Sequence, residues 1–174
     1  MQVATNYEWV KVGRLKIRFQ RAGRGPAVLL VHGLLGYSFS WRFAVPLLSE
    51  DREVFALDMP GSGFSGCDAG MDCRLESAAR RLLAFMDAVR IRSCDLVGSS
   101  YGGSTALMAA ALEPARVQSL VLVSPANPWS KTGRKRLMLL NFPRVRSIFP
   151  MIARRYLANE RPWLLHLGMH ISPA

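Results

Sequence analysis

Acidic residues are scarce in the last quarter of this 174-residue sequence, where residues 131–174 carry nine Lys or Arg but a single acid, Glu160. This segment therefore supplies most of the net charge of +11. A nucleic-acid-binding protein usually presents a basic face within a recognisable module, and no such module is present, so we expect no nucleic-acid partner. Three interpretations of the basic segment stay open: a solvated helical face, attraction of an anionic substrate, or docking on an anionic membrane surface.

Cysteine is also sparse, with three residues, Cys67, Cys73 and Cys94, and no CxxC pair. This argues against a disulfide framework or a zinc site and predicts free thiols in a reducing compartment. No stretch approaches the ~18 uninterrupted apolar residues that span a membrane. The first ten residues lack the basic-then-apolar pattern of a signal peptide. We therefore expect a cytoplasmic protein with no transmembrane segment, metal or cofactor.

Apolar residues make up half of the sequence, which predicts a globular domain. Alternating apolar and polar residues on both sides of Gly13 predict an antiparallel hairpin. Four continuous apolar runs follow, and each is typical of a strand buried on both faces. These runs cover residues 25–33, 53–61, 94–99 and 116–125.

Helical patterns separate these runs and cover residues 41–50, 74–90 and 101–112. In the second, apolar residues recur at helical spacing, most arginines lie on the opposite side, and Asp72 is predicted to cap the start. Strands that alternate with helices predict an α/β fold: a mostly parallel sheet with an N-terminal antiparallel hairpin and helices on both faces.

The strand pattern ends near residue 128. In the remaining residues, Pro143, Pro150 and Pro162 separate short helical stretches. We therefore divide the chain into a core, residues 1–128, and the start of a helical cap or lid, residues 129–174.

Ser100 lies where the apolar run 94–99 meets a small-residue helix. Gly98 and Gly102 flank it at two residues on either side, which leaves room for a very sharp turn. In this strand–turn–helix setting, G-x-S-x-G is typical of a nucleophile elbow. The following helix would direct its free N–H groups and positive dipole end towards developing negative charge. Ser100 is therefore the candidate nucleophile.

A second segment of interest, His32–Gly36 (HGLLG), follows the run that ends near residue 31. We predict that the backbone amides of Leu34 and Tyr101 form an oxyanion hole facing Ser100. For His32 we favour a supporting role, with ring hydrogen bonds that brace this loop, over a role as general base. Gly33 is assigned to the same structural support, as are Gly98 and Gly102.

The segment Gly61–Gly66 matches the dinucleotide-binding pattern G-x-G-x-x-G. However, Pro60 precedes it and no helical pattern begins directly after it, as that site requires. We therefore interpret it as a polar surface turn.

Three segments, VHGLLGYSFSW, ALDMPGSGFS and LVGSSYGG…SLVLVSP, together resemble the α/β-hydrolase superfamily, particularly its cap-bearing esterase-like branch. The resemblance covers nearly all of residues 5–128 in the expected order. It implies an α/β-hydrolase fold, with Ser100 as nucleophile and the amides of Leu34 and Tyr101 as oxyanion hole. Epoxide- and haloalkane-cleaving members carry Asp at the nucleophile position, so Ser100 argues against both reactions.

In this family the nucleophile is followed by an acid and then by a histidine. After Ser100 the sequence contains only the acids Glu113 and Glu160 and the histidines His166 and His170. Asn127 stands where some relatives carry the acid. We therefore expect an incomplete α/β-hydrolase fold, an N-terminal portion whose catalytic acid and histidine are encoded after residue 174.

The predicted function is that of a serine hydrolase acting on a carboxylic ester or related acyl compound, with a small apolar acyl substrate. Cofactor-free peroxidase chemistry and carbon–carbon bond hydrolysis stay open within the family. The alternative from another class is a non-catalytic module of this fold that binds a ligand or a partner. The sequence does not decide the oligomeric state.

Overall fold

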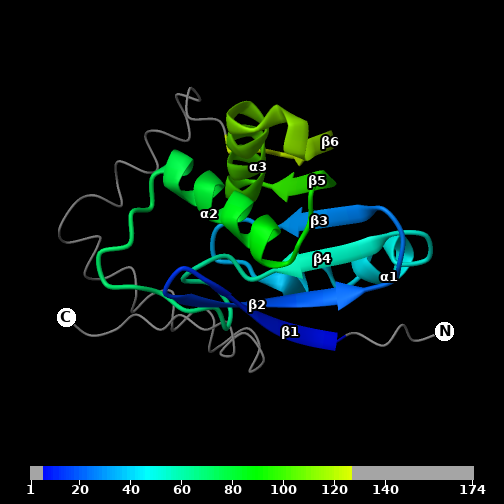
Figure 1. Ribbon diagram of the computed structural model, residues 1–174, viewed down its shortest axis with the longest axis horizontal. Helices are drawn as coiled ribbons and strands as arrows, with labels where there is room; N and C mark the ends of the chain where they lie inside the picture. The colour runs from blue at the N-terminus through cyan, green and yellow to red at the C-terminus, as the bar shows by residue number, and fades with distance from the viewer. Residues whose placement is uncertain (1–5, 127–174) are drawn as a thin grey trace, which may run out of the picture. The chain divides into compact units, whose positions relative to one another are not determined.

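The computed structural model describes residues 6–126 (Figure 1). Its contacts divide the chain into two units, residues 1–125 and 126–174. The predicted cap, residues 129–174, lies outside the described residues, so the boundary at residue 128 stays a prediction. The strands are β1 (Asn6–Val12), β2 (Leu15–Ala22), β3 (Ala27–Val31), β4 (Glu53–Leu57), β5 (Cys94–Ser99) and β6 (Val117–Val123). The helices are α1 (Ala44–Leu48), α2 (Leu75–Ala88) and α3 (Tyr101–Leu112), with short 3-10 helices η1 (Ser38–Trp41) and η2 (Pro114–Arg116).

The six described strands form one sheet in the order β1-β2-β4-β3-β5-β6. β1 pairs with β2 and β2 with β4 in antiparallel orientation, whereas β4, β3, β5 and β6 run parallel. The predicted α/β class, with a mostly parallel sheet and an N-terminal antiparallel hairpin, is confirmed.

Helices cover both faces of this sheet because its strands are apolar on both faces (Figure 1). Along β3, Leu29 and Val31 belong to the larger buried cluster, which also contains residues of α2 and α3. Val28 and Leu30 point the other way and pack in a smaller cluster with Val45 of α1. The alternation follows from the two-residue period of a strand.

Two local predictions were wrong in detail. The helix predicted over residues 41–50 is only the five-residue α1, and Trp41 instead ends the preceding η1. Pro46 lies in the first turn of α1, where a missing N–H costs no intrahelical hydrogen bond. The N-cap position of α2 is Arg74 and not Asp72; Asp72 instead accepts the N–H of Arg74 (2.9 Å) from two residues earlier.

The order of the strands determines where a site can form. From β3 the chain continues to β4 on one side, whereas β5 lies on the other side of β3. Loops that leave the carboxyl ends of β3 and β5 therefore diverge, and ligands of open α/β sheets bind at such switch points. Across residues 6–126, no helix is long and apolar enough to cross a membrane.

The core makes a direct stability prediction. Leu82 of α2 is fully buried between the helix and the sheet, so Leu82→Ala should lower the free energy of unfolding by about 2–5 kcal/mol through lost burial and a residual cavity. Leu107→Ala in α3 is the matched control, because that side chain is 49 % exposed; its cost should stay below about 1 kcal/mol. Urea unfolding measures both, and equal costs would contradict the described packing of α2.

Candidate active site

Ser100 forms the corner between β5 and α3. Its backbone has φ 50° and ψ −118°, a region that non-glycine residues adopt only under strain. Its N–H donates to the carbonyl of Val123 in β6 (3.0 Å), and its carbonyl accepts from the N–H of Ser104 (3.2 Å). The residue itself is exposed. The corner therefore presents Ser100 at the surface, at the carboxyl ends of the parallel strands.

Two glycines make this corner possible. A Cβ atom on Gly98 would lie 2.6 Å from the Cα of Gly103, and one on Gly102 would lie 2.4 Å from the carbonyl oxygens of Val31 and His32. Real side chains do not approach backbone atoms this closely, so only glycine lets β5, α3 and the end of β3 come together.

The loop after β3 runs beside Ser100. A Cβ atom on Gly33 would lie 3.1 Å from the Cβ and 3.8 Å from the Oγ of Ser100. Leu34 follows with its side chain 69 % exposed. The N–H of Tyr101 is among the first four of α3, which have no acceptor within the helix. The structure thus brings Gly33 and Tyr101 next to Ser100, while the oxyanion-hole role of the Leu34 and Tyr101 amides stays a prediction.

Both ring nitrogens of His32 have partners. Nδ1 lies 2.8 Å from the carbonyl oxygen of Gly33 and must donate to it, which leaves Nε2 to accept the N–H of Met59 (2.9 Å). Burial lowers the pKa of His32 from its ordinary value of 6.5, against weaker opposing effects of the Gly33 carbonyl and Asp58. A neutral ring engaged on both sides links the loop after β3 to the loop after β4, and neither nitrogen faces Ser100 as a free acceptor.

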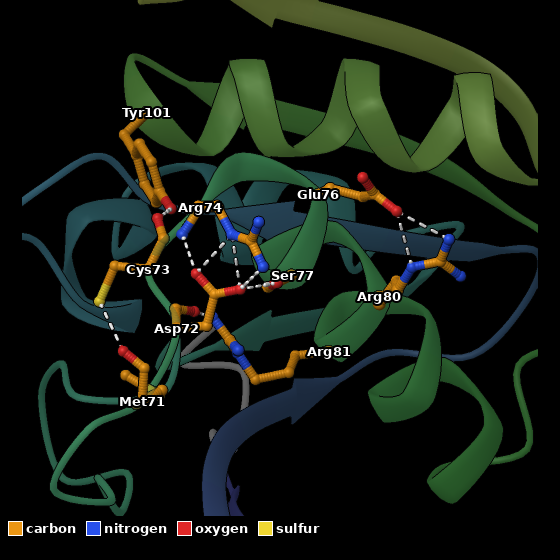
Figure 2. Close-up of polar contacts among 9 residues, drawn as sticks. All are labelled: Met71, Asp72, Cys73, Arg74, Glu76, Ser77, Arg80, Arg81 and Tyr101. Carbon is orange, nitrogen blue, oxygen red and sulfur yellow. Dashed lines mark hydrogen bonds and ion pairs between the residues drawn. The ribbon is translucent and has the colours of Figure 1, made fainter.

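The side chain of Tyr101 links the start of α3 to the segment before α2, as Figure 2 shows. Its hydroxyl donates to the carbonyl of Cys73 (3.2 Å). Asp72 accepts from the hydroxyl of Ser77, and its backbone carbonyl accepts from Arg81 (2.7 Å). Hydrogen bonds from Arg74 and Ser77 hold the pKa of Asp72 well below its usual range. These contacts attach Tyr101, the residue after Ser100, to the start of α2.

One buried polar group was missed from the sequence. Asp58, directly after β4, is fully buried and forms an ion pair with Arg18 of β2 (2.9 Å). It also accepts the N–H of Ser38, in the segment after β3 (2.8 Å). The sequence did contain a signal for this group, because Asp58 directly follows an apolar run, and a carboxylate buried there needs hydrogen-bond partners in place of water.

Of the remaining candidate residues, only Glu113 belongs to the described part of the chain, and it lies far from Ser100. Glu113 follows the last residue of α3, at the far end of that helix from Ser100, about 20 Å away by helix rise, and pairs with Arg116. Asn127, Glu160, His166, His170 and the basic segment lie outside the described residues.

Gly61–Gly66 forms turns and is followed by α2 only at Leu75, so no helix opens there as a dinucleotide site needs. Within residues 6–126 no group of His, Cys, Asp and Glu could hold a metal ion.

The close contacts around Gly102 predict that any side chain at this position strongly destabilises the fold. Gly102→Ala should lower the free energy of unfolding by at least about 2 kcal/mol, because the new methyl group overlaps two carbonyl oxygens of the β3 end. Gly66→Ala is the control, since a Cβ atom there makes contacts of 3.5 Å and the backbone φ is not positive. Thermal or urea unfolding would compare the two; a neutral Gly102→Ala would refute the described corner.

The lowered pKa of His32 predicts a pH effect. Well above pH 6.5 the ring is neutral in both folded and unfolded chains, so its contribution to stability is fully present. As the pH falls below 6.5, the unfolded chain binds a proton that the folded chain resists, and stability decreases. The ring resonances of His32 in NMR spectra should therefore stay unshifted from pH 7.5 to pH 6.5. A midpoint at or above 6.5 would contradict the buried, doubly bonded ring.

Comparison with known proteins agrees with this geometry. The family model described as alpha/beta hydrolase fold matches residues 26–165. A 2-hydroxymuconate semialdehyde hydrolase of Pseudomonas sp. (strain CF600) is 32 % identical over 178 residues, covering 91 % of this chain and 61 % of that protein. A 2-hydroxy-6-oxo-2,4-heptadienoate hydrolase of Pseudomonas putida is 36 % identical over 118 residues, covering 66 % of this chain and 42 % of that protein.

Among solved structures, a membrane phospholipase A described as a bacterial virulence factor superposes with a TM-score of 0.69 at 35 % identity, covering 73 % of this chain and 42 % of that chain. The chain thus spans roughly half the length of these relatives. The family match over residues 26–165, together with the sharp strand-to-helix corner at Ser100 and the sheet order, identifies the chain as a member of the α/β-hydrolase fold family.

Proposed function

We propose that the protein is a serine hydrolase of esterase type that acts on a small, apolar carboxylic ester or related acyl compound. The observation that carries this proposal is the strained backbone of Ser100, which exposes the residue beside Gly33 and at the start of α3. The two curated relatives are named as hydrolases, which supports hydrolysis as the reaction class.

The proposed reaction uses the hydroxyl of Ser100 and the main-chain amides beside it. The Oγ of Ser100 attacks the substrate carbonyl carbon while its proton passes to a histidine base. The carbonyl oxygen becomes an oxyanion, which accepts hydrogen bonds from the amides of Leu34 and Tyr101. When the tetrahedral intermediate collapses, the leaving alcohol takes the proton from the imidazolium, and an acyl-serine remains. Water then attacks the acyl group by the same route in reverse and releases the carboxylic acid.

A base and an acid are also part of the proposal. A serine hydroxyl is a weak nucleophile near neutral pH unless a base accepts its proton. His32 is engaged on both ring nitrogens, and Glu113 is remote. We assign the histidine and the acid to sequence encoded after residue 174, as the greater length of the relatives supports.

The test is covalent labelling of the protein expressed from its full coding region. A fluorophosphonate probe should label Ser100, as mass spectrometry of the tryptic peptides would show. Ser100→Ala should abolish this label and reduce hydrolysis of a p-nitrophenyl ester by at least about 10³-fold, to the residual catalysis of binding and dipoles.

Ser99→Ala is the matched control, since it changes the neighbouring hydroxyl and leaves Ser100 in place; labelling should persist. A folded wild-type protein that resists the probe and hydrolyses no ester would overturn the proposal. Such a result would favour the non-catalytic binding module.

A further inference from the structure

Two consecutive residues after β4 hold the loop after β3 at two points. The N–H of Met59 donates to Nε2 of His32 (2.9 Å), and Oδ1 of Asp58 accepts the N–H of Ser38 (2.8 Å). Between the two points lie residues 33–37, the oxyanion loop, which includes Leu34. We propose that Asp58, together with Arg18, is a positioning residue that fixes the oxyanion loop beside Ser100; this inference rests on the proposed function.

Asp58 joins three separate segments. Its Oδ2 accepts from Nε of Arg18 (2.9 Å) in β2 and from the N–H of Phe64 (3.0 Å), while Oδ1 accepts from Ser38. The side chain is fully buried, so water cannot replace a lost partner. Removing one member of such a buried ionic group is far more costly than breaking an exposed pair. The carboxylate therefore has one available position, and that position sets where Ser38 lies.

Arg18 is fixed as firmly as its partner. Its guanidinium lies 3.8 Å from the ring centroid of Phe64 and 4.4 Å from that of Tyr7. Its Nη2 also donates to the hydroxyl of Ser38 (3.4 Å). A planar guanidinium stacks on aromatic faces, so the two rings hold this side chain in one orientation. Arg18 and Asp58 thus act on Ser38 through both its hydroxyl and its N–H.

The oxyanion loop needs such external support. Leu35 has φ 63°, a conformation that costs a leucine energy unless its surroundings impose it. Within the loop, the N–H of Gly36 donates to the carbonyl of Gly33 (3.0 Å), which closes a tight turn. The strained turn is therefore held by the anchors at His32 and Ser38. Asp58 touches no reacting atom in this arrangement and acts through the loop.

Asp58→Asn is the informative variant. An amide offers one acceptor oxygen and one NH2 group, so at least one of the three N–H donors would face another donor. Amide hydrogen exchange in peptides covering residues 33–40 should become at least about 10-fold faster, while peptides of α3 should be unchanged. In the protein from its full coding region, kcat for a p-nitrophenyl ester and the fluorophosphonate labelling rate should fall about 10- to 100-fold, with KM little changed.

Glu53→Gln provides a matched control. Arg21 and Glu53 form a second guanidinium–carboxylate pair between the same strands, β2 and β4 (Nε to Oε1 2.9 Å), but this pair is exposed. Its loss should alter neither exchange nor kcat. Arg18→Lys keeps the positive charge and gives smaller changes in the same direction; it replaces Asp58→Asn if that variant does not fold.

Unchanged exchange of residues 33–40 in both variants would overturn the inference. Faster exchange with unchanged kcat and labelling would also overturn it, because the role would then be merely structural. A wild-type protein that is neither labelled nor active refutes the proposed function separately. In that case the exchange data still decide whether Asp58 holds the loop.

Discussion

The close contact between the end of β3, β5 and the first turn of α3 is the constraint on which the rest of the structure depends. Because Gly98 and Gly102 have no side chains, the helix can start directly against the strands. The chain must then reverse within one residue, which places Ser100 at φ 50°. Such strain costs on the order of 1–3 kcal/mol and persists only where surrounding packing enforces it. Exposure of Ser100 is thus a consequence of backbone packing.

Buried polar groups specify the loops around this corner. His32 and Asp58 each follow an apolar strand, β3 and β4, and each is almost fully buried. A buried polar atom without a partner is costly, so these side chains bind main-chain amides of Met59, Ser38 and Phe64. Each such bond determines the path of a loop that an apolar contact would leave adjustable. The ends of the strands thereby fix the paths of the loops beside Ser100.

Sequence patterns predicted the strands and the two long helices because burial on both faces and a 3.6-residue period are local signals. The bounds of β5 and α3 were predicted without error. The segment 41–50 was predicted poorly. Its helix α1 has only five residues, too few to show a helical repeat of apolar residues, and Val45 is buried by tertiary contacts with the sheet. Arg18 and Asp58 were missed for a related reason. They lie 40 residues apart, and only the pairing of β2 with β4 brings them together.

The geometry also limits the direction from which a base can reach Ser100. Gly33 and the oxyanion loop occupy the β3 side of the corner. In the proposed reaction the oxyanion binds on this side, so the group that takes the serine proton would approach from solvent or from the β6 side. Among the described strands β6 is an edge, and Val121 and Val123 remain about half exposed along it. Under the proposed function, the described residues would therefore separate the two tasks of the site, with the backbone that binds the oxyanion at β3 and α3 and the proton acceptor on the solvent or β6 side of Ser100.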